Sequence, residues 1–274
     1  MNKWIGPLCA AACGVVLGSG FTGDVDAWLR LALLVILVDG GWGTLWAALS
    51  GTDWSTPIEQ WREWSEEHPI TALPYTRVGA PSHRVTRRVV QFVSWWRTML
   101  WPSTSTALSS AIVAIPLIAI FSLILGPQVM VLSIAAIAMM QLGVIWEGGH
   151  GNVIPEWDAM PAIALPWLAG QAAFSSITLP SATIAFCLAL AYGTAWRVKS
   201  KWGIAFHVLF QLLPAVLLIL LAEPAAAAGY VALLVPQFIL LPWMKEGRLA
   251  GWYVAHSRWW LFATMVLSAL ALWA

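Results

Sequence analysis

The feature that most constrains this chain is a series of apolar runs, each about 20 residues long, separated by short breaks. A helix of about 20 residues crosses the roughly 30 Å hydrocarbon core of a bilayer. The sequence therefore predicts an all-α polytopic membrane protein that forms a single membrane domain over residues 1–274. We expect nine transmembrane helices, at 4–22, 27–48, 104–125, 127–146, 159–179, 181–197, 203–222, 224–243 and 256–274.

The composition agrees with a membrane location. Apolar residues make up 60% of the chain and charged residues 10%, whereas a soluble domain has roughly 45–50% and about 25%. The formal net charge is +1, which gives no clustered basic surface for nucleic-acid binding. Cys9, Cys13 and Cys187 lie inside apolar runs and lack the spacing of a disulfide framework or a zinc site. We therefore expect the lipid bilayer as a partner, no nucleic acid and no metal site.

Positive charge predicts the orientation, because Lys and Arg near the ends of spans stay in the cytoplasm. With the N-terminus inside, Arg30 is the one exception among the 14 Lys and Arg residues. The C-terminus is then outside, and the loops on the outer side are short. We expect an integral protein of the cytoplasmic (inner) membrane whose sizeable loops all face the cytoplasm.

The segment 49–103 is the longest of these loops, and we expect it to be a cytoplasmic interfacial loop with two amphipathic helices. The first begins at a capping box, Thr56 to Glu59, and stops at Pro69. The second has apolar residues at helical spacing from Val85 to Met99 with arginines alongside, and it bends or ends near Pro102. Each helix is interpreted as a membrane-surface anchor or as a docking site for a partner.

The chain is rich in tryptophan, with 20 residues, and most of them fall on the predicted cytoplasmic side. Tryptophan anchors proteins at membrane interfaces, but an ordinary aromatic belt occupies both of them. The excess on one side therefore has two further interpretations. It could form a stacking surface for a flat lipophile such as a quinone or pigment, or a docking face for another membrane subunit. The candidates for partner contact are Trp61, Trp64, Trp95, Trp96, Trp259 and Trp260.

Asp39 is the deepest ionisable residue in any predicted span. Charged groups inside a bilayer are costly and usually functional. At α-helical spacing Asp39 shares a face with Trp42, Gly43 and Trp46, and the neighbouring glycines permit close packing or a local break. Two hypotheses remain open: Asp39 forms a hydrogen bond that packs helices together, or it binds a ligand or a proton.

Other polar residues supply weaker candidates for ligand binding. The predicted loop that begins at Glu147 and contains His150 is either a solvated turn or a cation site, although its spacing matches no established metal motif. His207, one turn into the seventh span, either forms a hydrogen bond between helices or binds a quinone or pigment.

Nine spans, an inside N-terminus and a long inner loop after the second span resemble the UbiA-type intramembrane prenyltransferases. Residues 146–170 and 73–77 are similar to cytoplasmic segments of that family, and so is the start of the last span, Trp252 to Trp260. The resemblance implies a UbiA-like bundle that binds an isoprenyl diphosphate. It also implies two aspartate-rich motifs that hold Mg²⁺, at the ends of the second and sixth spans.

The chain departs from this pattern at both motifs. Asp39 and Asp53 are too far apart along a helix to share an ion, and the sixth span ends in Arg197, Lys199 and Lys201 without an acidic residue. We therefore expect a protein that has lost the magnesium and diphosphate motifs. It would be a structural or lipophile-binding subunit of a membrane complex. The alternative is a divergent prenyltransferase that uses an isoprenyl diphosphate, a lipophilic acceptor and Mg²⁺.

Overall fold

The computed structural model describes residues 6–18, 22–52, 54, 56, 60–61, 81–150, 155–246 and 250–273. Every regular element in these ranges is a helix, which confirms the all-α class. A helix overlaps each range predicted to span the membrane. The elements are α1 (Gly6–Leu17), α2 (Val25–Val35), η1 (Ile36–Gly43), α3 (Thr44–Ser50), α6 (Pro81–Trp95), η2 (Trp96–Leu100), α7 (Trp101–Leu125), α8 (Pro127–His150), α9 (Pro155–Ala159), η3 (Met160–Ala164), α10 (Leu165–Phe174), α11 (Leu179–Ala195), α12 (Lys201–Leu220), α13 (Pro224–Leu240), η4 (Pro242–Glu246) and α14 (Ala250–Trp273).

Within the described residues, five helices are long and apolar enough to cross a bilayer, so the chain is an integral membrane protein. They cover Val25–Ser50, Val85–Leu125, Pro127–Val144, Lys201–Leu220 and Pro224–Met244. The helices at the other four predicted spans are shorter or more polar. α1 and α11 are apolar but short, α14 carries His256 and Arg258, and the α9–α10 segment carries Asp158. Nine spans therefore stay a prediction.

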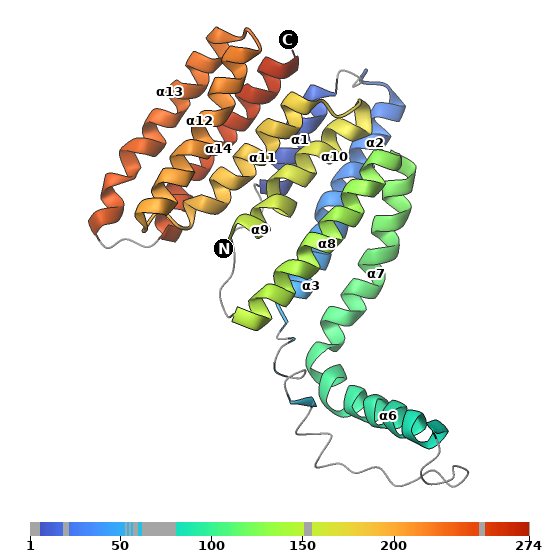
Figure 1. Cartoon of the computed structure of the whole chain (residues 1–274). Coiled ribbons are helices and arrows are strands. Elements are labelled where there is room, and N and C mark those ends of the chain that lie inside the picture. The colour runs from blue at the N-terminus through green and yellow to red at the C-terminus, as the bar shows by residue number, and fades with distance from the viewer. Residues whose placement is uncertain are drawn as a thin grey trace.

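The helices are stacked side by side, and the chain reverses direction from one long helix to the next (Figure 1). The turns between α7 and α8, α10 and α11, and α12 and α13 lie at the same end of the bundle as the C-terminus. The first described helix, α1, begins at the other end (Figure 1). Gly126, between α7 and α8, has a φ of 122°, a conformation that glycine adopts without steric strain.

α1 and α10 form the middle of the molecule. One buried cluster packs α1 and α10 against α11 to α14, and another packs the same two helices against η1, α3, α7 and α8. The two helices lie parallel, because the residues in contact advance together, from Gly6 beside Ala162 to Gly18 beside Phe174. At Gly14 and Gly170 the backbones approach so closely that an added Cβ would collide with the carbonyl oxygens of Trp167 and Ala11.

Polar caps fix where two of the helices begin. Asp24 precedes α2, and its carboxylate accepts a hydrogen bond from the backbone N–H of Ala27 at 2.8 Å. That hydrogen bond lowers the pKa of Asp24, with a smaller contribution from the Thr22 side chain. Ser200 precedes α12 and accepts from the N–H of Gly203 at 2.9 Å. Both caps lie directly before membrane-spanning helices and fix their first turns.

The second amphipathic helix predicted in the segment 49–103 is present as α6, and the predicted bend near Pro102 is confirmed. The π-helical turn η2 separates α6 from α7, and α6 lies across the lower end of α7 (Figure 1). Proline lacks the N–H of a regular helix, so the turn before it is free to depart from α-helical geometry. The first amphipathic helix falls almost entirely outside the described residues.

Candidate functional site

A group of buried polar side chains lies among α11, α12, α13 and α14. It includes His207, Gln211, Gln237, Tyr253 and Ser257, each at most 5% exposed. Polar side chains inside a membrane bundle are normally paired across helices, because lipid offers them no hydrogen-bond partner.

His207 connects three helices. Its Nδ1 lies 2.8 Å from the carbonyl oxygen of Ala191 in α11, and its Nε2 lies 2.8 Å from the hydroxyl oxygen of Tyr253 in α14. A carbonyl oxygen only accepts, so Nδ1 carries the proton and the Tyr253 hydroxyl donates to Nε2. This geometry fixes one neutral tautomer of His207. The prediction that His207 forms a hydrogen bond between helices is confirmed.

One turn further along α12, Gln211 forms a hydrogen bond with Gln237 of α13. The Nε2 of Gln211 donates to the Oε1 of Gln237 at 2.7 Å. The other two amide atoms, Oε1 of Gln211 and Nε2 of Gln237, are buried without a partner among the described residues. Buried polar atoms are nearly always paired, and an orphaned one costs about 1–3 kcal/mol. The pair thus offers one free acceptor and one free donor.

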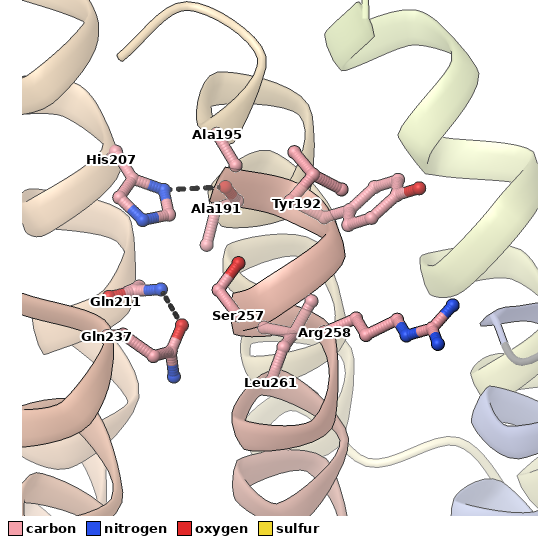
Figure 2. A pocket seen from close by; sticks show the side chains of 10 residues that line it. Ala191, Tyr192, Ala195, His207, Gln211, Gln237, Ser257, Arg258 and Leu261 are labelled. Atoms are coloured by element: carbon pink, nitrogen blue, oxygen red, sulfur yellow. Dashed lines mark hydrogen bonds between the residues drawn. The ribbon is translucent and has the colours of Figure 1, made fainter. Parts of the chain in front are cut away.

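A pocket adjoins these glutamines (Figure 2). Its lining residues are Ala191, Tyr192, Ala195, His207, Gln211, Gln237, Val254, Ser257, Arg258 and Leu261. About 10 Å³ is open to the centre of a water molecule, which is room for about one oxygen-sized group. His207 and the glutamines stand on one side, whereas the Arg258 side chain points away from them (Figure 2). Arg258 is exposed and Tyr192 half-buried, so they mark the outer side of the pocket.

Two prolines accompany the glutamines in their helices. Pro214 is in α12 and Pro236 is in α13, directly before Gln237. A proline inside a helix removes the N–H that would bind the carbonyl four residues earlier. The carbonyls left without that donor are those of Phe210, directly before Gln211, and of Ala232 in α13.

The pocket suits binding better than metal chemistry. No carboxylate lines it, and among the described residues no group of three or more His, Cys, Asp or Glu side chains is placed to hold a metal ion. A group that accepts from Nε2 of Gln237, or one that donates to Oε1 of Gln211, would satisfy one of the orphaned atoms. A hydroxyl group or a water molecule can take either role, and a carbonyl group can take the first.

Asp39 is placed differently from its prediction. Its side chain is exposed, whereas Trp42 is 2% exposed and Trp46 is half-buried. The reason is η1, a π-helix from Ile36 to Gly43, which has more residues per turn than an α-helix. The expectation that Asp39 shares a face with Trp42 and Trp46 is therefore wrong, whereas Gly43 does lie beside it, since an added Cβ at Gly43 would be 4.0 Å from Oδ1 of Asp39. An aspartate at the centre of a membrane span costs about 2.5–3.5 kcal/mol on insertion scales.

The remaining polar candidates do not join the pocket. Glu147 and His150 belong to α8, which continues to His150. The backbone there is helical, so the predicted loop is wrong. The side chains of these two residues are not described. Asp53 is also outside them. Arg197, Lys199 and Lys201 are exposed around the connection between α11 and α12.

The tryptophans proposed for partner contact fall into two separate groups. Trp61 packs edge-on against Trp95, with ring centroids 5.1 Å apart, and against Phe92 at 6.3 Å. Trp95 is buried and Trp96 half-buried in the same cluster. Trp259 and Trp260 are exposed on α14, on the opposite side of the molecule from α6 (Figure 1). Trp64 is outside the described residues.

Gln211, Gln237 and Tyr253 were not among the residues predicted from the sequence. A signal was present for Gln211, since it follows His207 by four residues in an otherwise apolar run and so shares a helix face with it. Comparisons of the chain with protein-family models, with curated proteins and with solved structures find no match. The resemblance to UbiA-type prenyltransferases therefore rests on the sequence alone.

Proposed function

We propose that this chain is a membrane-complex subunit that binds the polar group of a lipophilic molecule, such as a quinone or pigment, among α11 to α14. The observation that carries the proposal is the pair of orphaned amide atoms on Gln211 and Gln237. Both glutamines are 1% exposed and line the same pocket. A bound carbonyl or hydroxyl oxygen would remove the free-energy cost of leaving these atoms unpaired.

The location of the site favours a lipophile over a water-soluble ligand. α12 and α13 both belong to segments long and apolar enough to span the membrane. The pocket admits one oxygen-sized group, so the rest of the ligand would lie outside it, beside Tyr192 and Arg258. An apolar body reaches that position through the bilayer, and its oxygen is the part that the glutamines recognise.

The test compares the lipophiles that co-purify with the wild-type protein and with a Gln211→Leu/Gln237→Leu variant. The protein is purified in mild detergent, and extracted lipophiles are quantified by mass spectrometry relative to protein. We expect one oxygen-bearing lipophile to fall at least tenfold in the variant, since each lost hydrogen bond is worth about 1 kcal/mol.

Gln171→Leu is the matched control, because Gln171 is another buried glutamine with an unpaired Oε1, in α10 and away from the pocket. It should retain the lipophile at the wild-type level. Equal loss in the control and the double variant would show that the change reflects general destabilisation. Unchanged content in the double variant would mean that the glutamines hold only water or each other.

The alternative function, a divergent Mg²⁺-dependent prenyltransferase, is tested separately. The purified protein is incubated with an isoprenyl diphosphate and a lipophilic acceptor, with and without EDTA. We expect no turnover, because Arg197, Lys199 and Lys201 stand where the second aspartate-rich motif of the resembled family would be. Turnover that EDTA abolishes would support the enzyme and refute the loss of the magnesium motifs.

A further inference from the structure

Asp39 stands out because it is exposed in the middle of a membrane-spanning helix. The segment Val25–Ser50 is long and apolar enough to span the bilayer. Asp39 lies roughly 21 Å from Val25 and roughly 16 Å from Ser50 at about 1.5 Å per residue. Its side chain is too short to reach the membrane surface as Lys and Arg side chains do. It forms no hydrogen bond or ion pair with any residue that the structure describes.

The helix around Asp39 has one occupied side and one open side. Gly41 is buried against α7, where an added Cβ would lie 2.8 Å from Cγ1 of Ile118. Asp39, Gly40, Gly43 and Thr44 are exposed on the other side. An added Cβ at Gly40 or Gly43 meets no atom of another helix within 4 Å. Apart from Asp39, the exposed residues on this side have small side chains. The backbone of a second helix could therefore come close to Asp39.

We propose that this open side of η1 binds a transmembrane helix of another membrane protein that carries a Lys or Arg near the middle of its span. A carboxyl group at this depth needs a hydrogen-bond donor, and a basic side chain supplies both a donor and the opposite charge. A second copy of this chain fits less well, because the exposed residues from Ile36 to Ala47 include an acid but no base.

This inference rests on the membrane-complex part of the proposed function and is independent of the glutamine pocket. The pocket lies among α11 to α14, whereas η1 packs against α7 and α1. The two proposals therefore fail separately. The Gln211→Leu/Gln237→Leu variant should bind the partner helix normally, and an Asp39→Leu variant should retain the lipophile.

The experiment uses a synthetic polyleucine helix of about 21 residues as the probe. One version has a central Lys and the other has Leu at that position, and both carry a photo-crosslinking leucine analogue next to it. Each peptide is reconstituted with the full-length protein in lipid nanodiscs and illuminated. We expect at least tenfold more crosslinking for the Lys peptide, with crosslinks that mass spectrometry maps to residues 36–47.

Asp39→Leu should abolish the difference between the two peptides. The variant replaces a polar group by an apolar one at a lipid-exposed position, so we expect it to fold like the wild type. Asp26→Leu is the matched control, since Asp26 is an exposed aspartate in the first turn of the same span, and it should behave like the wild type. Equal crosslinking of both peptides, a retained preference of Asp39→Leu for the Lys peptide, or crosslinks that map away from residues 36–47 would overturn the proposal.

Discussion

His207 shows how much a single buried polar residue determines in this molecule. Its two hydrogen bonds join α12 to α11 and to α14, and the aromatic ring of Tyr253 meets the imidazole edge-on with centroids 5.4 Å apart. Both partners lack contact with water, so each bond has to be made within the protein. The orientation of His207 therefore fixes the relative position of three helices beside the pocket.

We predict that His207 and Tyr253 are energetically coupled. His207→Leu leaves the Tyr253 hydroxyl without an acceptor, and Tyr253→Phe leaves Nε2 of His207 without a donor, so each should destabilise the protein by about 1–3 kcal/mol. In the double variant the same bond is lost once, so the destabilisation should be smaller than the sum by about 0.6–1.7 kcal/mol. Unfolding in detergent, followed by near-ultraviolet circular dichroism, measures all four proteins.

Ser268→Ala provides the control for this cycle. Ser268 is buried in α14, but its hydroxyl donates to Thr264 of the same helix at 2.8 Å, so it does not join helices. Combined with Tyr253→Phe it should give additive effects. If the destabilisations of His207→Leu and Tyr253→Phe were also additive, the coupling would be contradicted. The two residues would then stabilise the protein independently.

Among the elements, the pair of α1 and α10 is the most tightly packed, and glycine makes it possible. Gly14 and Gly170 each bring the backbone of one helix against the backbone of the other. This close approach is typical of small-residue contacts between membrane helices. Because both helices also contribute to the two buried clusters, their separation decides how the two sides of the molecule fit together.

We predict that Gly14→Ala and Gly170→Ala each prevent normal packing, with destabilisation of about 3 kcal/mol or more, because the new methyl group meets rigid backbone. Gly229→Ala is the control, since its methyl group would meet only the flexible end of Leu267, at 3.3 Å. Melting temperatures in detergent measure the three variants. If Gly14→Ala and Gly170→Ala have the same melting temperature as Gly229→Ala, α1 and α10 can move apart without loss of stability. The close packing would then not be required.

The elements also show what the sequence was able to predict. Apolar runs and their breaks predicted where helices lie, because length and hydropathy alone decide this in a bilayer. The π-helical segments were not predictable, since hydropathy says nothing about the number of residues per turn. That single difference separates the exposed Asp39 from Trp42 and Trp46, with which it was expected to share a face. Likewise, a loop was predicted to begin at Glu147, but α8 continues to His150.

At the scale of the whole molecule, the candidate site was only partly predictable. His207 stood out as a lone histidine in an apolar span, whereas Gln237 comes from a different span, and only the packing of α12 on α13 brings it to Gln211. The tryptophans predicted to form one partner surface lie in two separate places, again because the packing of the helices decides which residues meet. Trp61 turned inward onto Trp95, while Trp259 and Trp260 stayed exposed on a distant helix.

Whole-molecule topology is the remaining question, and the two possible span counts give opposite results in one experiment. Nine spans place seven crossings between Trp54 and Ala274, so the two positions lie on opposite sides of the membrane. The five helices that are long and apolar enough place four crossings there, so both positions lie on the same side. In Figure 1, α1, α10, α11 and α14 lie alongside the five, and nine spans are the arrangement that the sequence predicts.

We therefore predict that a reporter fused after Trp54 is cytoplasmic and one fused after Ala274 is outside. Green fluorescent protein and alkaline phosphatase, which are active only inside and only outside respectively, give complementary signals for each position. A second pair of sites, after Asn152 and after Ser176, tests the α9–α10 segment alone, because it is crossed only in the nine-span arrangement. The charge distribution sets the direction, since Arg30 alone among the 14 Lys and Arg would lie outside. The same side for Trp54 and Ala274 would exclude nine spans and remove the topological basis of the resemblance to UbiA-type enzymes.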